Sequence, residues 1–292
     1  MANAGLFSLL PSRRGLLGIN GRNLEYIYPY NARRFFPNVD DKLRCKQLLS
    51  EAGIPVPKTY QVIDGPRQLK DWPRYVAQVE SFVIKPNRGY GGNGIQLVRK
   101  TGAGFSSGDG LLDADDITFH IMQICSGAFS HDNFADIAFL EETIINHPDL
   151  SELVGPGVSG VVDVRLILRG EEPVMAMARV PTRASKGRAN LHQGGIGIGI
   201  DLETGSTMNG CHHNGVISEH PETGRVLAGQ ILPGFTQLLE YGSAVCEIVK
   251  LGYIGVDFVC DERSGWQVLE VNARPGLNIQ IANQMGLRKR LV

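Results

Sequence analysis

Two apolar runs near the end of the chain are the most informative part of the sequence for its fold: Gly255-Val256-Asp257-Phe258-Val259-Cys260 and Val268-Leu269-Glu270-Val271-Asn272-Ala273-Arg274-Pro275-Gly276. We interpret them as two antiparallel β-strands joined by the turn at residues 261–265. If residues 262–265 form a four-residue loop, Asp257 lies directly opposite Glu270. Asn272 shares a face with Glu270, because alternate residues of a strand point to the same side.

The three oxygen-bearing side chains of this hairpin predict a metal site. Asp257, Glu270 and Asn272 offer hard oxygen ligands, which suit Mg²⁺ with water and substrate phosphates completing its shell. The alternative is a buried acid satisfied by backbone groups or by an arginine, which is the usual state of a single buried carboxylate. The convergence of three such side chains favours the metal.

Composition limits the class of protein. With 292 residues the chain is long enough for one large domain or two smaller ones. Charge is balanced, with 29 Lys and Arg against 30 Asp and Glu, so it predicts neither a nucleic-acid nor a membrane partner. The five cysteines show no paired spacing, which favours reduced thiols in a cytoplasmic protein.

A glycine-rich hairpin is predicted in the first half of the chain. Residues 82–86 and 95–98 are apolar strands, and the segment between them contains Gly91, Gly92 and Gly94. Backbone N–H groups of such a loop can surround phosphate oxygens, and Lys85 at the strand end can reach the same phosphates. The alternative is an ordinary turn that uses glycine for its geometry.

Two neighbouring segments add candidate nucleotide ligands. Lys42 lies on a helix that is capped by Asp40 and stopped by Gly53, although a solvated basic face is the commoner explanation of such a lysine. A strand over residues 137–142 ends in Glu141 and Glu142, which suits an adenosine pocket or simply a strand that reaches solvent.

Arginines set among apolar neighbours mark the second half. Arg165 and Arg179 lie in strands 161–168 and 173–180, where arginine usually pairs with an acid or a bound anion. The following polar loop, with Arg188 and Asn190, is either a solvated surface or a lid over an anionic ligand. A zinc site at residues 211–213 and His220 is disfavoured, since no second Cys/His pair stands at finger spacing.

The remaining segments receive coarser predictions. Helices are expected at residues 115–129, 232–251 and 278–287, and loops at 99–112 and 151–160. Residues 1–38 are irregular and are expected to lie against the body of the protein or a second subunit.

A set of motifs follows in order over residues 39–285: Asp41-Lys42-Leu43-Arg44, Gly53-Ile54-Pro55-Val56-Pro57, Val83-Ile84-Lys85-Pro86, Gly91-Gly92-Asn93-Gly94-Ile95, Glu141-Glu142, Asp163-Val164-Arg165, Asn190 to Gly195, and the closing hairpin. This ordered set resembles the ATP-grasp ligases, most closely the RimK-type branch with the α-L-glutamate ligase-like proteins.

This resemblance implies an α+β ATP-grasp fold in which two α+β subdomains, residues 39–145 and 146–292, grip ATP. Residues 1–38 would form an N-terminal segment in place of a full pre-ATP-grasp domain. The implied phosphate ligands are Lys42, Lys85, Gly91, Gly92 and Gly94. Glu141 and Glu142 would flank the adenosine, and Asp257, Glu270 and Asn272 would hold two Mg²⁺ ions, with Mn²⁺ as a substitute. The groups implied to contact the phosphates, the acyl phosphate or the carboxylate substrate are Arg165, Arg179, Arg188, Asn190 and Arg274.

The implied reaction joins an amino acid (glutamate or similar) to an amine or peptide through an acyl phosphate. A small-molecule or peptide substrate and a homo-oligomer are expected. The alternatives are a phosphotransferase and a nucleotide-binding partner protein without turnover. Gln193 stands where the RimK-type motif has a basic residue, so the carboxylate substrate can differ from glutamate.

Overall fold

The computed structural model describes residues 15–89, 91–108, 110–130, 134–185, 187, 189–213 and 215–291. The chain divides into two compact α+β units, as the sequence predicted for the fold class. Unit 1 comprises Met1–Asp40, Arg44–Val56 and Ile144–Val292, and unit 2 comprises Asp41–Leu43 and Pro57–Thr143. Residues 44–56, which the sequence grouped with the first subdomain, therefore cluster with the second half of the chain.

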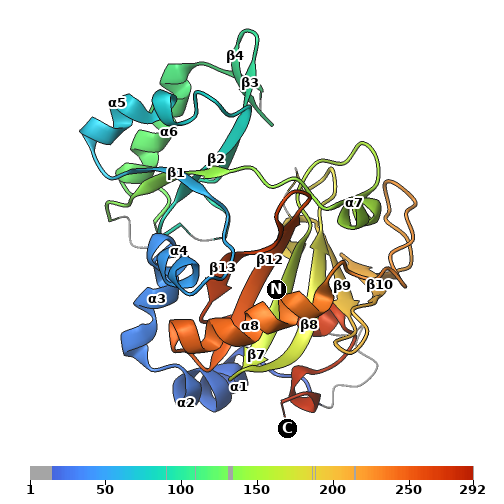
Figure 1. Ribbon diagram of the computed structural model, residues 1–292. Helices are drawn as coiled ribbons and strands as arrows, with labels where there is room; N and C mark the ends of the chain where they lie inside the picture. Colours follow the sequence, from blue (N-terminus) through green and yellow to red (C-terminus); the bar gives the residue numbers. More distant parts are fainter. Residues whose placement is uncertain are drawn as a thin grey trace. The chain divides into compact units, whose positions relative to one another are not determined.

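Unit 2 is built on a six-stranded antiparallel sheet of order β1-β6-β2-β3-β4-β5 (Figure 1). Its elements are β1 (Thr59–Ile63), α5 (Pro66–Tyr75), β2 (Ser81–Pro86), β3 (Gln96–Thr101), β4 (Gly104–Ser107), β5 (Gly110–Leu112), α6 (Ala114–Cys125) and β6 (Ala138–Glu142). Strands β4 and β5 occupy part of the segment expected to be a loop, because runs of four and three residues show too little alternation to be recognised.

The core of unit 2 follows the sequence periodicities. On α6, Ile117, Ile121 and Ile124 recur at helical spacing and are completely buried. Strand β2 alternates, so Phe82 and Ile84 face this core while Lys85 points to the opposite face of the sheet. The alternation is what delivers Lys85 to the candidate site.

Unit 1 contains a seven-stranded antiparallel sheet of order β11-β10-β9-β8-β7-β12-β13. Its strands are β7 (Asp163–Arg169), β8 (Glu172–Val180), β9 (Ile196–Ile200), β10 (Thr207–His212), β11 (Gly215–Ile217), β12 (Tyr253–Asp261) and β13 (Gly265–Asn272). Its helices include α7 (Pro148–Val154), in a segment expected to be a loop, α8 (Phe235–Val249) and α9 (Ile279–Ala282). Helix α9 is shorter than predicted, and this part of the unit also contains the 3₁₀ turns η4 (Leu191–Gln193) and η5 (Leu287–Lys289).

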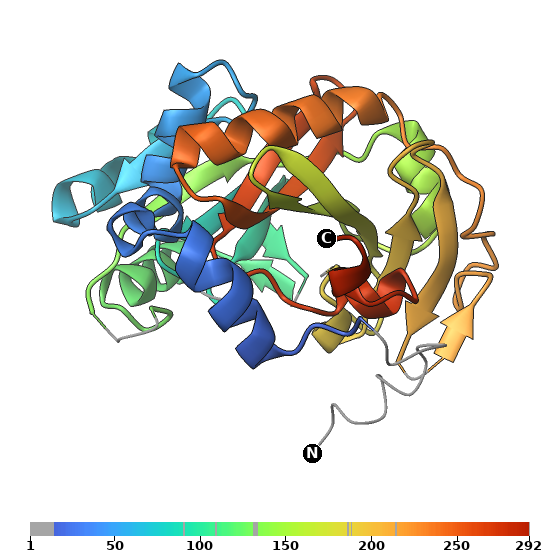
Figure 2. The same ribbon diagram turned by 90° about the horizontal axis from the view of Figure 1, so that it is seen from below.

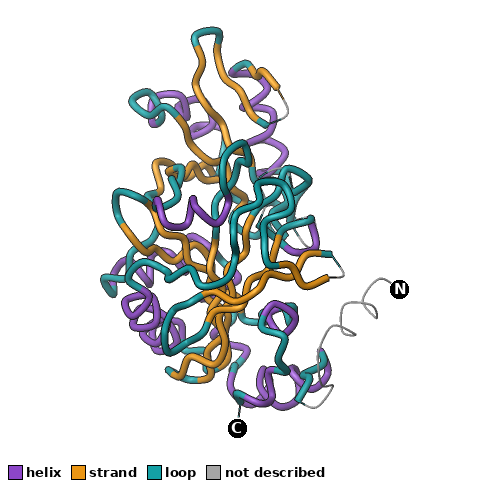
Figure 3. The backbone as a smooth tube through the Cα atoms, turned by 90° about the vertical axis from the view of Figure 1, so that its right-hand side faces the viewer, coloured by secondary structure: helices purple, strands orange, loops and turns teal. Residues whose placement is uncertain are grey.

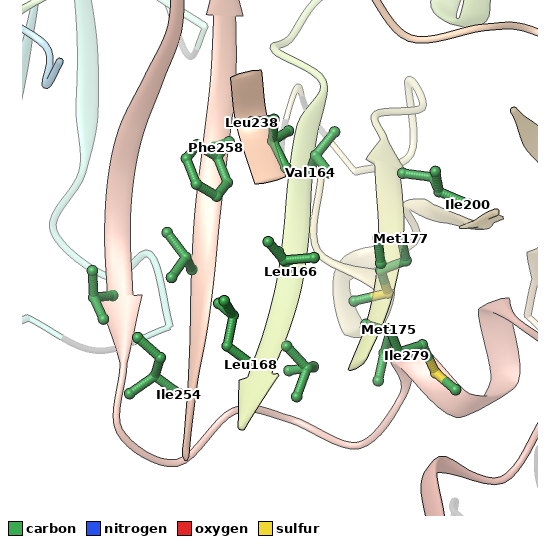
Figure 4. Close-up of a cluster of buried hydrophobic side chains, with 14 of the residues drawn as sticks. Val164, Leu166, Leu168, Met175, Met177, Ile200, Leu238, Ile254, Phe258 and Ile279 are labelled. Atoms are coloured by element: carbon green, nitrogen blue, oxygen red, sulfur yellow. The ribbon is translucent and has the colours of Figure 1, made fainter. Parts of the chain in front are cut away.

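The two faces of this sheet have different characters. Leu166 and Phe258 point towards α8, and Figure 4 shows Leu238 of that helix beside Phe258 and Val164. Gly242 permits this approach, because a Cβ there would lie 2.5 Å from Leu166 Cδ2. The opposite face carries the polar residues that alternate with these, and Figure 2 shows α9 on that side of the sheet.

The β12–β13 hairpin reaches the predicted pairing by a different route. Asp257 does lie opposite Glu270, but Asp261 pairs with Gly265, so the loop has three residues rather than four. The register shifts between Asp257 and Phe258, where Leu269 is an extra residue on β13. This β-bulge compensates for the shorter turn.

The N-terminal part of unit 1 is a series of short helical pieces: α1 (Ile19–Arg22), the π-helical turn η2 (Asn23–Ile27), α2 (Tyr28–Tyr30), the 3₁₀ turn η3 (Arg33–Phe35) and α3 (Pro37–Asp40). Helix α4 (Lys42–Glu51) follows directly, as predicted. These pieces pack against unit 1: the Tyr26 and Tyr253 rings lie 5.3 Å apart, and Asn38 Nδ2 donates to Val249 O. In Figure 3 they lie beside the C-terminal turn of the same unit.

Candidate functional site

Asp257 is the centre of a buried polar network on the sheet of unit 1. Its side chain is almost fully buried and accepts two hydrogen bonds of 2.7 Å from Arg165, one to each carboxylate oxygen. Arg179 Nη2 donates to the same carboxylate at 2.9 Å, and Asn272 Nδ2 lies 3.3 Å from Asp257 Oδ2. Four neighbouring strands thus place four predicted site residues in one cluster.

Arg179 connects this cluster to two further groups. Its Nε donates to Asp163 and its Nη1 donates to Asn190 Oδ1 at 2.9 Å. Burial disfavours the guanidinium charge, but Asp163 and Asp257 together raise the pKa of Arg179 above its usual value. Arg179 therefore stays charged and is fixed in one orientation by three acceptors.

The two buried acids differ in their proton affinity. Burial raises the pKa of Asp163 to about 6. Arg179 lowers this pKa, whereas repulsion from the Asp257 carboxylate raises it further. Burial also opposes ionisation of Asp257, but Arg165 and Arg179 outweigh it and hold the pKa of Asp257 below its usual value. Asp257 is ionised at neutral pH and carries the charge that orients both arginines.

The predicted metal ligands are neighbours, and Asp257 is also paired with arginine. Glu270 lies opposite Asp257 in the ladder, and Asn272 contacts Asp257 directly. The arginine contacts match the alternative interpretation of this acid as a buried, paired carboxylate. Among the residues that the structure describes, no group of three His, Cys, Asp or Glu side chains forms a metal cluster. The trio of two carboxylates and an amide thus stays a prediction.

The glycine loop of unit 2 has the conformation that its sequence demands. Gly91, Gly92 and Gly94 have φ values of 65°, 82° and 76°, which other residues rarely adopt. A Cβ on Gly94 would also lie 2.7 Å from Phe129 Cγ. Lys42 Nζ donates to Gly89 O at 2.7 Å, so this predicted phosphate ligand is attached to the loop itself.

Three residues that sequence reasoning missed hold the loop. Asp136 accepts from Arg88 N at 2.9 Å, and His120 Nε2 lies 2.9 Å from Gly94 O. Burial lowers the pKa of His120, so the neutral ring is present at neutral pH. Asn87 Oδ1 accepts from Leu43 N at 2.8 Å and caps α4, the role expected of Asp40. No local pattern reveals these residues, because their partners are 26 to 48 residues away.

The predicted nucleotide acids have local partners in unit 2. Lys85 Nζ forms an ion pair with Glu141, whose side chain is 2% exposed. Glu142 Oε1 accepts from Lys58 N at 2.6 Å. Lys85 thus supplies the positive charge that a buried Glu141 requires, whether or not a phosphate is nearby.

The predicted site residues fall into two groups. Unit 2 holds the phosphate and adenosine candidates, and unit 1 holds Arg165, Arg179, Asn190 and the metal trio. Arg274 makes a separate contact, with its guanidinium carbon 4.5 Å from the centre of the Phe36 ring. Arg188 lies outside the described residues.

Other sequence features lead to no site. The rings of His212 and His213 lie 4.0 Å apart. All five cysteines are free thiols. In the part of the chain that the structure describes, no helix is long and apolar enough to cross a membrane.

Comparisons with known proteins point to one family. A family model described as sugar-transfer associated ATP-grasp matches residues 21–292. No curated protein matches the sequence significantly.

Several solved structures share the fold at low identity. The chain is similar to D-cycloserine synthetase DcsG (TM-score 0.50, 14% identity, covering 88% of this chain and 70% of that one). It is also similar to a Rhizobium etli pyruvate carboxylase with acetyl coenzyme-A (TM-score 0.51, 12% identity, 91% and 18%). The ATP-grasp ligase PsnB with a minimal precursor gives a TM-score of 0.46 at 19% identity, covering 85% of this chain and 56% of that one. The chain thus spans little more than half the length of PsnB.

Proposed function

Because this chain belongs to the sugar-transfer associated ATP-grasp family, we propose that it is an ATP- and Mg²⁺-dependent ligase that joins a carboxylate to an amine. The matching family model is one of the ATP-grasp superfamily, as the resemblance implied, but it is not that of the RimK-type branch. Glutamate as the substrate is therefore not part of the proposal.

The observation that carries the proposal is the orientation of the two arginines by Asp257. Arg165 and Arg179 are fixed before any ligand binds, as stabilisation of a developing negative charge requires. In the first step a substrate carboxylate oxygen bonds to the γ-phosphorus of ATP while the bond to ADP breaks. In the second step the amine nitrogen attacks the acyl carbon and phosphate leaves. Arg179 would stabilise the oxyanion of that second step.

The residues of the closing hairpin fit magnesium. Glu270 and Asp257 provide carboxylates, and the hydrogen bond from Asn272 Nδ2 to Asp257 directs the amide oxygen of Asn272 away from that carboxylate. Two carboxylates and an amide form an oxygen-only donor set, which Mg²⁺ prefers over softer ligands. When bound, the metal would supply charge neutralisation to the phosphates.

In unit 2, Lys42 and Lys85 with the glycine loop are proposed to bind phosphate oxygens of ATP. Both ammonium groups are already held, Lys42 by Gly89 O and Lys85 by Glu141. Held cations lose little side-chain entropy on binding an anion. Glu141 and Glu142 at the end of β6 are proposed to lie near the adenosine.

A screen of ADP release tests this function. Carboxylates (amino acids, peptides and sugar acids) are offered in pairs with amines, including amino sugars, and the Glu270→Ala variant serves as the inactive control. We expect ADP release that depends on both partners and an amide product by mass spectrometry. A stable phosphorylated product formed without any amine would instead establish a phosphotransferase. Tight ATP binding with no turnover on any pair would support a binding protein.

A further inference from the structure

The N-terminal pieces of unit 1 contact the loop that follows the candidate metal strand. The loop comprises residues 273–275, directly after Asn272, and includes the substrate candidate Arg274. Asn31 and Arg22 donate hydrogen bonds to its three consecutive carbonyls. All of these residues belong to unit 1.

Asn31 joins the two strands of the closing hairpin at their outer ends. Its side chain accepts from Tyr253 N at 2.9 Å and donates to Tyr253 O at 2.7 Å, as a neighbouring strand would. The same Nδ2 lies 3.1 Å from Ala273 O. Asn31 is 3% exposed, so its hydrogen bonds are protected from water and bind the start of β12 to the residue after Asn272.

Arg22 and Phe36 hold the next residues of the loop. Arg22 Nη1 donates to Pro275 O at 2.8 Å and lies 3.4 Å from Arg274 O. The Arg274 guanidinium lies over the ring of Phe36, and Arg274 is an exposed residue. A planar cation held on an aromatic face is well suited to an anionic group such as a carboxylate or phosphate.

Strand β12 lies close to the same loop at Gly255. Gly255 is the ladder partner of Asn272, and a Cβ there would lie 2.7 Å from Pro275 Cβ. The loop is therefore enclosed between β12 and the N-terminal pieces.

We propose that Arg22, Asn31 and Phe36, the N-terminal brace, position Asn272 for the metal and Arg274 for the anionic substrate group. This inference rests on the proposed function, since it assumes that Asn272 and Arg274 act on the nucleotide complex. The three are positioning residues, because they act through the loop. The N-terminal segment is thus a working part of the active site.

Isothermal titration of the full chain with ADP, in Mg²⁺ and in EDTA, tests the brace. Arg22→Ala is expected to weaken ADP binding about tenfold in Mg²⁺, roughly the loss of one charge-assisted hydrogen bond, and to leave binding in EDTA unchanged. Arg22→Lys keeps a donor for Pro275 O and should recover part of the affinity. Arg33→Ala, an exposed arginine on the same segment, is the matched control and should bind like the wild type.

Phe36→Leu supplies a second variant, in case Arg22→Ala does not fold. It should retain Mg²⁺-dependent ADP binding but bind inorganic phosphate, the probe for the anion at Arg274, more weakly than the wild type; an unchanged phosphate affinity would overturn the role of Phe36. If Mg²⁺ does not increase the ADP affinity of the wild type, the metal site and the proposed function are refuted together with the brace. If Mg²⁺ increases the ADP affinity of the wild type and Arg22→Ala binds ADP in Mg²⁺ as tightly as the wild type, the brace alone is refuted. Equal weakening with and without Mg²⁺, together with a lower Tm, would show a purely structural role and also overturn it.

Discussion

At the scale of single residues, Arg179 shows how charge is arranged in unit 1. It is 5% exposed and donates hydrogen bonds to Asp163, Asp257 and Asn190. Removing one partner of a buried ion pair costs about 3–5 kcal/mol, because the other charge is left without compensation. Substitutions of Arg179 therefore confound chemistry with folding, and half-buried residues give cleaner tests.

Glu270 is such a residue. We expect Glu270→Ala to abolish ATP turnover while Tm changes by no more than a few degrees, because the side chain lies at the edge of the buried network. ADP release and thermal unfolding measure the two effects separately. Glu262→Ala, an exposed acid in the turn of the same hairpin, should retain full activity. Wild-type turnover in Glu270→Ala would remove the metal assignment.

Asp163 predicts a particular pH dependence of stability. Its pKa is about 6 in the folded chain against 3.8 for the ordinary group, so between these values the folded state binds more protons. The free energy of unfolding therefore falls by on the order of 1 kcal/mol per pH unit from this group as pH rises through that window. Asp163→Asn removes this loss.

Urea unfolding from pH 4 to pH 7 measures the effect of Asp163→Asn. The stability of the variant relative to the wild type should increase with pH, by up to about 3 kcal/mol over the window. A difference that does not vary with pH would mean that Asp163 ionises normally within the network.

At the scale of elements, regular secondary structure was the most predictable part. The α6 stripe and α8 follow from periodicity, since each places one apolar face on a core, and the strands of the closing hairpin follow from their continuous apolar runs. Helix α7 and strands β4 and β5 were missed, because seven residues or fewer carry too little pattern. The predicted length of the hairpin loop was wrong by one residue, because the local sequence does not indicate a β-bulge.

Asp261 stabilises that turn and gives a second pH test. It is fully buried and accepts from Ile145 N at 2.9 Å and Arg263 N at 3.0 Å. Although burial opposes ionisation, these bonds and the Arg263 guanidinium hold its pKa far below the ordinary value. The stabilisation is fully present above pH 4 and is lost as pH falls towards the folded pKa.

Asp261→Asn should therefore lower the free energy of unfolding by about 1–3 kcal/mol at pH 7. The deficit should shrink steadily below pH 4, which denaturant unfolding at pH 7 and pH 3 can check. Asp201→Asn is a comparison that should cost less, because Asp201 also accepts from loop N–H groups but is only half-buried. An equal deficit at both pH values would show that the carboxylate charge does not matter.

At the scale of the whole molecule, the residues that the structure describes form two hydrophobic cores. The sequence predicted two subdomains and the residue types of both candidate groups. It could not predict that Lys85 pairs with Glu141 or that Asp257 takes both arginines, because these contacts join strands 56 to 92 residues apart. Asp136 and His120 stayed hidden for the same reason.

The two tryptophans make the cores separately observable. Trp72 lies in the core of unit 2 and Trp266 in that of unit 1, and both are buried. In the single-tryptophan variants Trp72→Phe and Trp266→Phe, fluorescence follows the unfolding of one unit at a time. Each proposed residue group makes its own prediction. If the group of unit 1 binds nucleotide, Mg²⁺ with ADP should raise the midpoint of Trp72→Phe, and if the group of unit 2 does, it should raise that of Trp266→Phe, since a ligand stabilises the unit that must be folded to bind it. An unchanged midpoint in either variant would disprove the role of the group in the unit that it reports.

The bulge at Leu269 has a consequence for how this hairpin can change during evolution. A relative with one more residue in the turn and no bulge would still place an acid at 257 opposite an acid at 270. An insertion in the turn together with a deletion of the bulge residue thus leaves the two acids opposite each other. Sequence alignments of this region therefore need two compensating gaps, and an ungapped alignment would misplace the turn residues of such a relative while matching its acids correctly.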